Sequence, residues 1–527
     1  MDRRGFVKLG LAAGGAAGLP RTQAAVPSVL DAGVQHQQDL MAANKLTSHA
    51  LTSQYLARIN TIDKSGPRIN SIIEINPEAL KIAREMDRER HQRKLRGPLH
   101  GIPVLLKDNI ATADRMSTTA GSLALAGIRA ARDSHVAARL REAGAVIIGK
   151  TNLSEWANMR SSHSVSGWSA RGGLTRNPYS LDRNCSGSSS GSGAAIAAGL
   201  ATLAVGTETD GSIVSPASIC GLVGIKPTIG LVSRSGIIPI AHSQDTAGPM
   251  ARSVSDAALM LAAMAGIDPN DPVTQDGAGK AADYSSALKR DALRGKRLGV
   301  ARNFFGGSDG VDAEIEKALE ALKAQGAILV DVQVPNTEKY GDSETEVLLH
   351  EFKVDLAAYL RDYAPNAKVK NMADLIAFNK QNAKLEMPYF GQEYLERAEA
   401  KPGLDSQAYQ DALANNHRYS RKEGIDLVLK AHELDALVAP TDGTAWLTDF
   451  INGDHYPKSF SSPAAVAGYP HVTVPAGYVR GLPVGLSFVG TAFSEAALIG
   501  MAYAFEQATM VRRAPQFPPS VSVAVAR

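Results

Sequence analysis

Cysteine and aromatic residues are scarce in this chain of 527 residues, which has two cysteines and 6% Phe, Trp and Tyr. Cys185 and Cys220 are too few for a disulfide framework, and their spacing matches neither a zinc site nor a redox pair. We expect both to be small buried side chains. With 44% apolar and 21% charged residues, the composition is that of a globular protein with a large core.

The chain also has little net charge. Lys and Arg number 56 against 53 Asp and Glu, a net charge of +3, and no long basic run stands beside aromatic residues. We therefore expect no nucleic-acid partner. Residues 1–24 contain four basic residues against Asp2 alone, so this segment carries the whole surplus and the remainder of the chain is formally neutral.

Long hydrophobic runs are absent as well. Arg3, Arg4 and Lys8 precede the apolar stretch 9–19, and small residues follow it. This layout resembles a secretory signal peptide of the twin-arginine type. The stretch has about 11 residues, short of the roughly 20 that span a bilayer. We expect residues 1–24 to be a removable signal and the protein to be exported, periplasmic or secreted, without stable membrane insertion.

The rest of the chain, residues 25–527, is predicted to form one interrupted domain. Residues 25–100 have helical periodicity and read as peripheral helices, and the polar segment 268–422 reads as a mostly helical flank. Between and after them, apolar strand-like runs alternate with helical ones, which favours an α/β layered sheet. Strands are expected at 102–106, 145–148, 203–206, 436–439, 471–475 and 483–489, and helices at 78–93, 134–143, 193–200 and 495–507.

A serine- and glycine-rich stretch, residues 186–193, is the most unusual feature of the sequence. Such a composition is usual in flexible linkers. Here it leads directly into residues 194–200, a small-residue segment that is apolar nearly all round and must be buried as a helix. The loop is therefore expected to be positioned structure, with backbone N–H groups facing a polar partner or an anion.

Three known kinds of site contain motifs similar to the serine motifs of this chain. A nucleotide-binding P-loop is excluded because the stretch lacks its lysine. The run Gly187–Gly191 satisfies the Gly-x-Ser-x-Gly elbow of α/β-hydrolases, but residues 175–180 before it read as loop where the elbow needs a strand, so it stays a minor alternative. Ser286 and Lys289 match a Ser-x-x-Lys pattern in a charged segment without partner motifs, and we treat this match as chance.

Several ordered blocks over residues 40 to 510 resemble the amidase signature family. The resemblance implies an α/β fold with a large mixed central sheet covered by helices on both faces, and a serine amidase that needs no metal and no cofactor. The blocks are Leu105–Asn109, Gly149–Asn152, Asn184–Ile213, Pro216–Ala217, Gly221, Gly224–Gly230, Asp245–Pro249 and Ala467–Gly490.

The same resemblance implies a catalytic set of two serines and a lysine. Matched to this sequence, the nucleophile is Ser212, the bridging serine is Ser188 with a cis peptide bond to Gly187, and the base is Lys107. The backbone N–H groups of the turn Thr209, Asp210, Gly211 and Ser212 are implied as the oxyanion hole. A serine hydroxyl needs an adjacent base that removes its proton.

Lysine acts as a base only when it is neutral. A free lysine has a pKa of about 10.4, and burial lowers this by up to about 3 to 5 units. Lys107 follows the apolar run Val104–Leu106, so we expect it at the end of a strand and desolvated. Lys226 is the rival candidate, but Pro227 beside it indicates a structural turn.

One departure from the family pattern bears on the substrate. Many relatives have an arginine two residues after the nucleophile, and this chain has Val214. Without that bidentate partner, a substrate carboxylate near the scissile amide, or a glutamine-dependent amidotransferase role, is not favoured. Residues 151–158, 167–173 and 209–214 look closest to the members that remove the C-terminal amide of peptides.

The sequence therefore predicts hydrolysis of a small-molecule or short-peptide amide, most specifically a peptide C-terminal amide, through an acyl-enzyme on Ser212. Two alternatives stay open. One is an amidase or esterase of the same fold acting on aliphatic or aryl amides. The other, from a different class, is an exported solute-binding protein.

Overall fold

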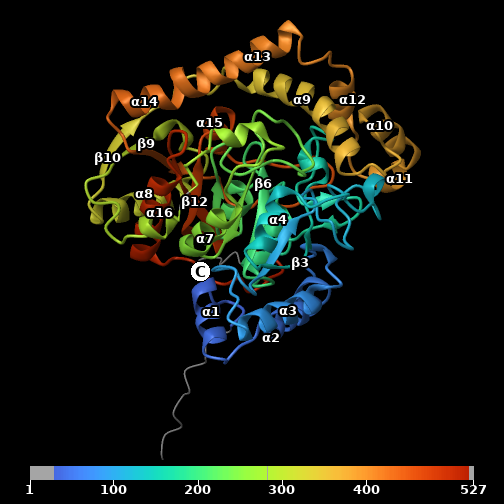
Figure 1. Cartoon of the computed structure of the whole chain (residues 1–527). Helices are drawn as coiled ribbons and strands as arrows, with labels where there is room; N and C mark the ends of the chain where they lie inside the picture. Colours follow the sequence, from blue (N-terminus) through green and yellow to red (C-terminus); the bar gives the residue numbers. More distant parts are fainter. Residues whose placement is uncertain (1–28, 282, 522–527) are drawn as a thin grey trace, which may run out of the picture.

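A mixed sheet of eleven strands runs through the centre of the computed structural model, which describes residues 29–281 and 283–521 (Figure 1). β2 is parallel to β3 and β6, and β9 is parallel to β10 and β11, whereas the remaining neighbours are antiparallel. The strands, in their order across the sheet, are β1 (Ile72–Ile75), β3 (Val146–Thr151), β2 (Pro103–Lys107), β6 (Leu203–Glu208), β8 (Thr246–Ala251), β7 (Val223–Lys226), β12 (His471–Val479), β13 (Leu482–Val489), β11 (Ala436–Pro440), β9 (Arg297–Ala301) and β10 (Ile328–Val332).

The parallel strands β3, β2 and β6 bring polar residues together at their carboxyl ends. All three are buried along their whole length, as their apolar sequences require of parallel strands covered on both faces. Lys107 is the last residue of β2 and lies opposite Thr151, the last residue of β3, while Leu106 lies opposite Val205 of β6. Ligands of open α/β sheets bind at the carboxyl ends of the strands, so we expect a site at the carboxyl ends of these three strands.

Helices cover both faces of the sheet. The buried helix α5 packs on β2, β3, β6 and β8, and the buried helix α6 packs on β7, β12 and β13. α7 packs on β6, β7 and β8, α8 and α16 pack on β12 and β13, and α4 packs on α7. The α-helices of the described residues are α1 (Val34–Ala42), α2 (Ser48–Arg58), α3 (Ala79–His91), α4 (His135–Glu142), α5 (Ser190–Ala197), α6 (Val214–Ile219), α7 (Val254–Met264), α8 (Asp309–Ala324), α9 (Gly341–Asp362), α10 (Met372–Gln381), α11 (Ala383–Glu386), α12 (Glu393–Glu399), α13 (Gln407–His417), α14 (Asp426–Ala431), α15 (Ser461–Ala467) and α16 (Glu495–Thr509).

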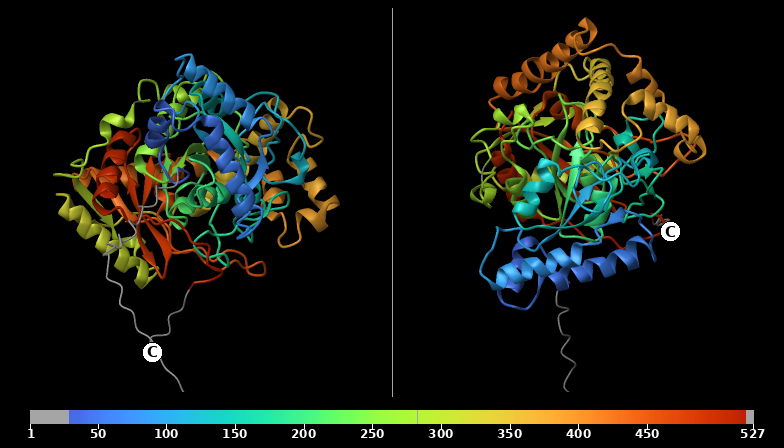
Figure 2. Two further views of the ribbon diagram at one scale, coloured as in Figure 1. Left: turned by 90° about the horizontal axis from the view of Figure 1, so that it is seen from below. Right: turned by 45° about the vertical axis from the view of Figure 1, so that its right-hand side comes forward.

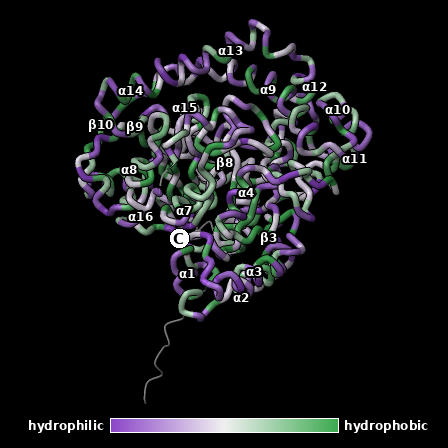
Figure 3. The backbone as a smooth tube through the Cα atoms, viewed as in Figure 1, coloured by the Kyte–Doolittle hydropathy of each residue, from purple (hydrophilic) through white to green (hydrophobic). Residues whose placement is uncertain are grey.

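Two groups of helices lie outside this core. α1 to α3 form a layer at the base, and α9 to α14 arch over the opposite side (Figures 1 and 2). α9 attaches the arch, because Leu349, Phe352, Leu356 and Leu360 fall on one helical face and are fully buried against the loops that follow β2 and β3. Hydrophilic stretches concentrate on this arch and apolar ones in the interior (Figure 3).

The predicted fold class is confirmed, and each predicted strand and helix has a counterpart within a few residues. Two strands of the segment 268–422 were not predicted. β9 and β10 extend the sheet beyond β11, so this segment supplies sheet as well as helices. β10 was hard to find because it lies at the sheet edge and is partly exposed, and because Asp331 interrupts its short apolar run.

Three smaller expectations concern the chain ends and the cysteines. The predicted signal, residues 1–24, lies outside the described residues. Across residues 29–281 and 283–521, no helix combines the length and the apolar character needed to cross a bilayer. Cys185 and Cys220 are both buried, as expected, and both are free thiols, a point that the sequence left open.

Candidate active site

Lys107 lies fully buried at the end of β2 and contacts three oxygens. Its Nζ is 2.8 Å from Ser188 Oγ, 2.8 Å from Thr207 Oγ1 and 3.1 Å from the Thr207 carbonyl oxygen. Burial lowers the pKa of Lys107 to about 7, although the charges of Asp245 and Glu208 oppose the shift. The side chain is therefore poised between its charged and neutral forms near neutral pH.

The two serines continue this contact chain. Ser188 Oγ is 3.0 Å from Ser212 Oγ, so Lys107, Ser188 and Ser212 form one hydrogen-bonded series. Ser188 precedes α5, and its peptide bond with Gly187 is cis. Gly187 has no room for a side chain, because a Cβ there would lie 2.2 Å from Ser154 Oγ. The glycine-serine stretch is thus packed structure rather than a linker.

The surroundings of Lys107 favour the transfer of a proton from Ser188. A neutral amine has two N–H groups and one lone pair. The two oxygens of Thr207 can take both N–H groups, which leaves the lone pair for the hydroxyl of Ser188. The hydroxyl of Ser188 is then a donor to Lys107 and an acceptor for the hydroxyl of Ser212.

The turn from Thr209 to Ser212 follows β6 and carries free backbone donors. Within the described part of the chain, the N–H groups of these four residues make no hydrogen bond. Gly211 has a φ of +76°, which a glycine adopts without strain, and this shapes the turn. Glu208 anchors the following residues, because it accepts hydrogen bonds from the N–H groups of Ile213 and Val214 at 2.7 and 3.0 Å.

Ser212 opens into a cavity of about 340 Å³ that also borders Gly187 and the whole turn. Its wall is partly apolar, with Met159, Leu348 and Tyr394. Among the described residues that line it there is no Lys, Arg or His. The size is at the lower end of the range of pockets that hold small ligands.

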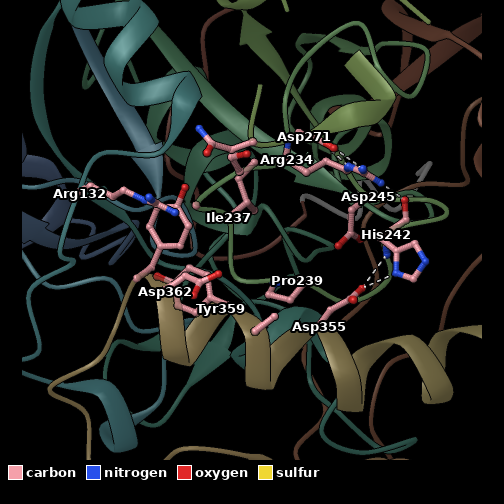
Figure 4. Close-up of a pocket in the computed structure, with 15 residues that line it drawn as sticks. Arg132, Arg234, Ile237, Pro239, His242, Asp245, Asp271, Asp355, Tyr359 and Asp362 are labelled. Carbon is pink, nitrogen blue, oxygen red and sulfur yellow. Dashed lines mark hydrogen bonds and ion pairs between the residues drawn. The ribbon is translucent and has the colours of Figure 1, made fainter. Parts of the chain in front are cut away.

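Asp245 borders a second cavity, of about 250 Å³ (Figure 4). Asp245 also borders a small void of about 10 Å³ beside Ser188 and Ser212. Its carboxylate accepts hydrogen bonds from Thr209 Oγ1 at 2.5 Å and from the N–H groups of Ile240 and Ala241. Burial nevertheless raises the pKa of Asp245 to about 6.

The same region holds the one group of side chains, within the residues described, whose spacing suits a metal ion. Ligand atoms of His242, Glu351 and Asp355 lie within 4.8 Å of one another. Hydrogen bonds already occupy these atoms. His242 Nδ1 is 2.8 Å from Asp355 (Figure 4). Glu351 accepts hydrogen bonds from Tyr409 and from the N–H of Ser243. Internal pairing therefore accounts for the group.

The hydrolase-elbow alternative does not fit the geometry. The central serine of Gly187–Gly191 is Ser189, and within the described residues no strand of the main sheet directly precedes it. Its hydroxyl bonds the backbone of Thr207, donating to the carbonyl at 3.1 Å and accepting from the N–H at 3.2 Å. Ser189 therefore ties the loop to β6.

Three residues beside the site were missed by sequence reasoning. Thr207 supplies two of the contacts of Lys107, and Asn109 Nδ2 donates to Thr207 Oγ1 at 3.0 Å. Asp245 faces the turn as described above. Their signal was weak in the sequence: Asn109 follows β2, Thr207 lies within β6 and Asp245 directly precedes β8. A buried polar residue at such a position has to find partners.

Comparison with known proteins agrees with this geometry. The family model described as Amidase matches residues 50–499. A probable amidase of Arabidopsis thaliana is 42% identical over 93% of this chain and 92% of its own length. The crystal structure of the peptide amidase PAM in complex with the competitive inhibitor chymostatin has a TM-score of 0.90 and 54% identity, covering 92% of this chain and 99% of that one. Native peptide amidase from Stenotrophomonas maltophilia gives a TM-score of 0.88 and 53% identity over 92% and 98% of the two chains. The chain belongs to the amidase signature family and is a hydrolase of amide C–N bonds.

Proposed function

We propose that the chain hydrolyses the C-terminal amide of short peptides, with Ser212 as nucleophile, Ser188 as proton bridge and Lys107 as base. The observation that carries the proposal is the continuous series from Lys107 Nζ through Ser188 Oγ to Ser212 Oγ, with steps of 2.8 and 3.0 Å, which ends at the cavity. A nucleophile and its base within hydrogen-bond reach are the signature of covalent catalysis.

In the acylation step, Ser212 Oγ attacks the carbonyl carbon of the amide. Its proton passes to Ser188 Oγ while the proton of Ser188 passes to Lys107 Nζ. The negative charge that develops on the carbonyl oxygen is stabilised by the free N–H groups of the turn Thr209–Ser212, where the loss of one such donor typically costs about 2.7 to 4 kcal/mol. Ser188 then gives its proton to the amide nitrogen while Lys107 returns a proton to Ser188, the C–N bond breaks, and ammonia leaves.

In the deacylation step, a water molecule attacks the ester on Ser212. It gives its proton through the same groups to Lys107, and the C–O bond to Ser212 breaks as the proton returns to the serine. The products are a carboxylic acid and the free enzyme. No other reactant enters the balance.

The substrate class follows from what surrounds Ser212. A cavity of about 340 Å³ without a lining cation suits a neutral carboxamide better than a carboxylate. Val214, which stands where many relatives have arginine, begins α6 and is buried, so no bidentate partner for a carboxylate replaces it at that position. The high identity to peptide amidase further supports this choice over aliphatic or aryl amides.

The test is a substrate comparison with a matched variant. Purified protein should release ammonia from an N-acetylated dipeptide amide faster than from a simple fatty amide, and Ser212→Ala should abolish both reactions. Ser218→Ala is the control, because Ser218 lies on α6 and its buried hydroxyl has no hydrogen-bond partner among residues 29–281 and 283–521. Full turnover by Ser212→Ala would remove the proposed nucleophile, and a preference for the fatty amide would remove the peptide substrate.

Export is a separate part of the proposal and rests on the sequence of residues 1–24. Fractionation of cells expressing the full chain, with N-terminal sequencing of the product, tests it. Replacement of both Arg3 and Arg4 by lysine should block export by the twin-arginine route.

A further inference from the structure

Three carboxyl groups from separate elements form one wall of the cavity that contains Ser212. Asp210 lies in the turn after β6, Glu344 lies in the first turn of α9, and Asp442 follows β11. We call these three residues the acidic wall. None of them belongs to the proposed relay of Lys107, Ser188 and Ser212.

Serine hydroxyls connect the members of the acidic wall. Ser459 lies beside Asp442, Ser461 lies beside Asp210, and the Oγ atoms of Ser459 and Ser461 are 3.2 Å apart. Asp210 and Glu344 contact each other, and Gln244 Nε2 donates to Glu344 Oε1 at 2.9 Å. The wall is therefore continuous, not three unrelated residues.

Among the described residues that line the cavity, no cationic side chain neutralises the acidic wall. Burial raises the pKa of all three carboxyl groups, and mutual repulsion adds to this for Glu344 and Asp442. Lys226 attracts Asp210 from behind, but it is fully buried and its strongest charge partner is Glu208. A cation in the cavity would relieve this repulsion.

Unused acceptors on the wall point to a ligand. Asp442 is 2% exposed and lines the cavity, yet within the described part of the chain neither its Oδ2 nor Oδ1 of Asp210 has a hydrogen-bond donor. Buried carboxylate oxygens normally have donors, so each of these is an open position for one. The apolar side chains of Met159, Leu348 and Tyr394 in the same cavity suit the carbon stem of a long cationic side chain.

We propose that the acidic wall is a subsite for a cationic group of the substrate, an ammonium or guanidinium carried close to the scissile carboxamide. This inference rests on the peptide-amide function proposed above. Because one cavity of about 340 Å³ holds both Ser212 and the wall, the cation belongs to the amidated residue or its neighbour. It is either a lysine or arginine side chain or the free α-ammonium of a dipeptide amide.

The first experiment uses the unmodified enzyme and measures kcat/KM for three amides at pH 8, which form two pairs. Acetyl-Ala-Lys-amide is compared with acetyl-Ala-norleucine-amide, which has the same stem without the charge. Ala-norleucine-amide is compared with its acetylated form, which isolates the α-ammonium. We expect at least a tenfold preference for the cationic member of one pair, and the pair that shows it identifies the source of the cation.

The second experiment uses variants of the wall. Asp442→Asn and Glu344→Gln should each lower kcat/KM for the preferred cationic amide at least fivefold more than for its neutral partner. Asp342→Asn makes the same charge change at an exposed position two residues before Glu344 and should leave both values unchanged. Two variants at separate elements guard against a folding defect in either one.

The outcomes separate the subsite from the function it depends on. Turnover of peptide amides with equal rates in both pairs would overturn the subsite and leave the function standing. A charge preference that survives in both Asp442→Asn and Glu344→Gln would also overturn it. Loss of turnover for every peptide amide, with fatty amides still hydrolysed through Ser212, would overturn the function and the subsite together.

Discussion

The pH dependence of turnover is the sharpest test of Lys107 as the proposed buried base. Burial lowers the pKa of Lys107 from 10.5 to about 7, a change of about 3.5 units that corresponds to about 5 kcal/mol. At pH 7 about half of the molecules then hold a neutral Lys107, whereas an exposed lysine would be neutral in fewer than about one in 1,000. The gain in active base is therefore about a thousandfold.

We expect kcat/KM to be level above pH 8 and to fall tenfold per pH unit below about pH 6.5, with an apparent pKa of about 7. The assay is ammonia release from an N-acetylated dipeptide amide of alanine and norleucine between pH 5 and 10 at constant ionic strength. This substrate has no group that titrates in the range, so the profile reports the free enzyme.

Asp442 is the group that could imitate this result, because burial raises its pKa to about 7 as well. The profile of Asp442→Asn separates the two, since the acid limb should keep its position if Lys107 causes it. A profile that stays level down to pH 5, or one that rises only above pH 9, would refute a buried neutral lysine. A limb that disappears in Asp442→Asn would assign it to the carboxyl group.

Three further results are expected. Lys107→Met should abolish turnover and raise the melting temperature at pH 7, and equal melting temperatures at pH 7 would contradict this. The lysine of the unfolded chain keeps its proton up to about pH 10.5, whereas that of the folded chain loses it above about pH 7, so the stability of the wild type rises with pH between these values. The stability advantage of methionine, at most about 5 kcal/mol, should therefore shrink by pH 10. Asp245→Asn removes a charge that raises the pKa of Lys107, so the acid limb should move to lower pH, and an unmoved or raised limb would show that Asp245 does not act on the base. Arg160→Met leaves Glu155 buried without its cation and should lower the free energy of unfolding in urea by about 3 to 5 kcal/mol, whereas a loss below about 1 kcal/mol would show that the pair is dispensable.

Sequence reasoning recovered those parts of the fold whose pattern is local. Continuous apolar runs marked β2, β3 and β6, because strands buried on both faces have no polar alternation. The small-residue helix α5 was found for the same reason, since all of its residues are buried. β10 escaped because a partly exposed edge strand depends on pairing with β9, which is a contact that no local pattern records.

The residues of the site show the same difference between local sequence patterns and tertiary contacts. Lys107, Ser188 and Ser212 were named from ordered motifs, and the structure brings their side chains together. Their partners could not be derived in this way, because Asp245 reaches the turn through the fold and Glu344 arrives on α9, 132 residues after Ser212. Residues that act through tertiary contacts carry no fixed spacing from the residues they serve.

Burial alone does not distinguish the proposed base from its rivals. Within the described chain, Lys107, Lys150 and Lys226 are all fully buried, and burial lowers each pKa, to about 7, 8 and 8 respectively. Lys150 donates to the Ile110 carbonyl and Thr118, and Lys226 donates to the Pro227 carbonyl.

Lys107 differs from Lys150 and Lys226 in what its hydrogen-bond partner contacts next. The hydroxyl of Thr118 lies beside the carbonyl of Ile110, where the hydrogen-bond series from Lys150 ends, and a carbonyl cannot pass a proton onward. Ser188 leads on to Ser212, and Ser212 borders the cavity. A buried lysine becomes a useful base where a second hydroxyl connects it to a surface that substrate can reach. The fold meets this condition at the ends of β2 and β6, where the strand that carries the lysine lies beside the strand that leads into the nucleophile turn.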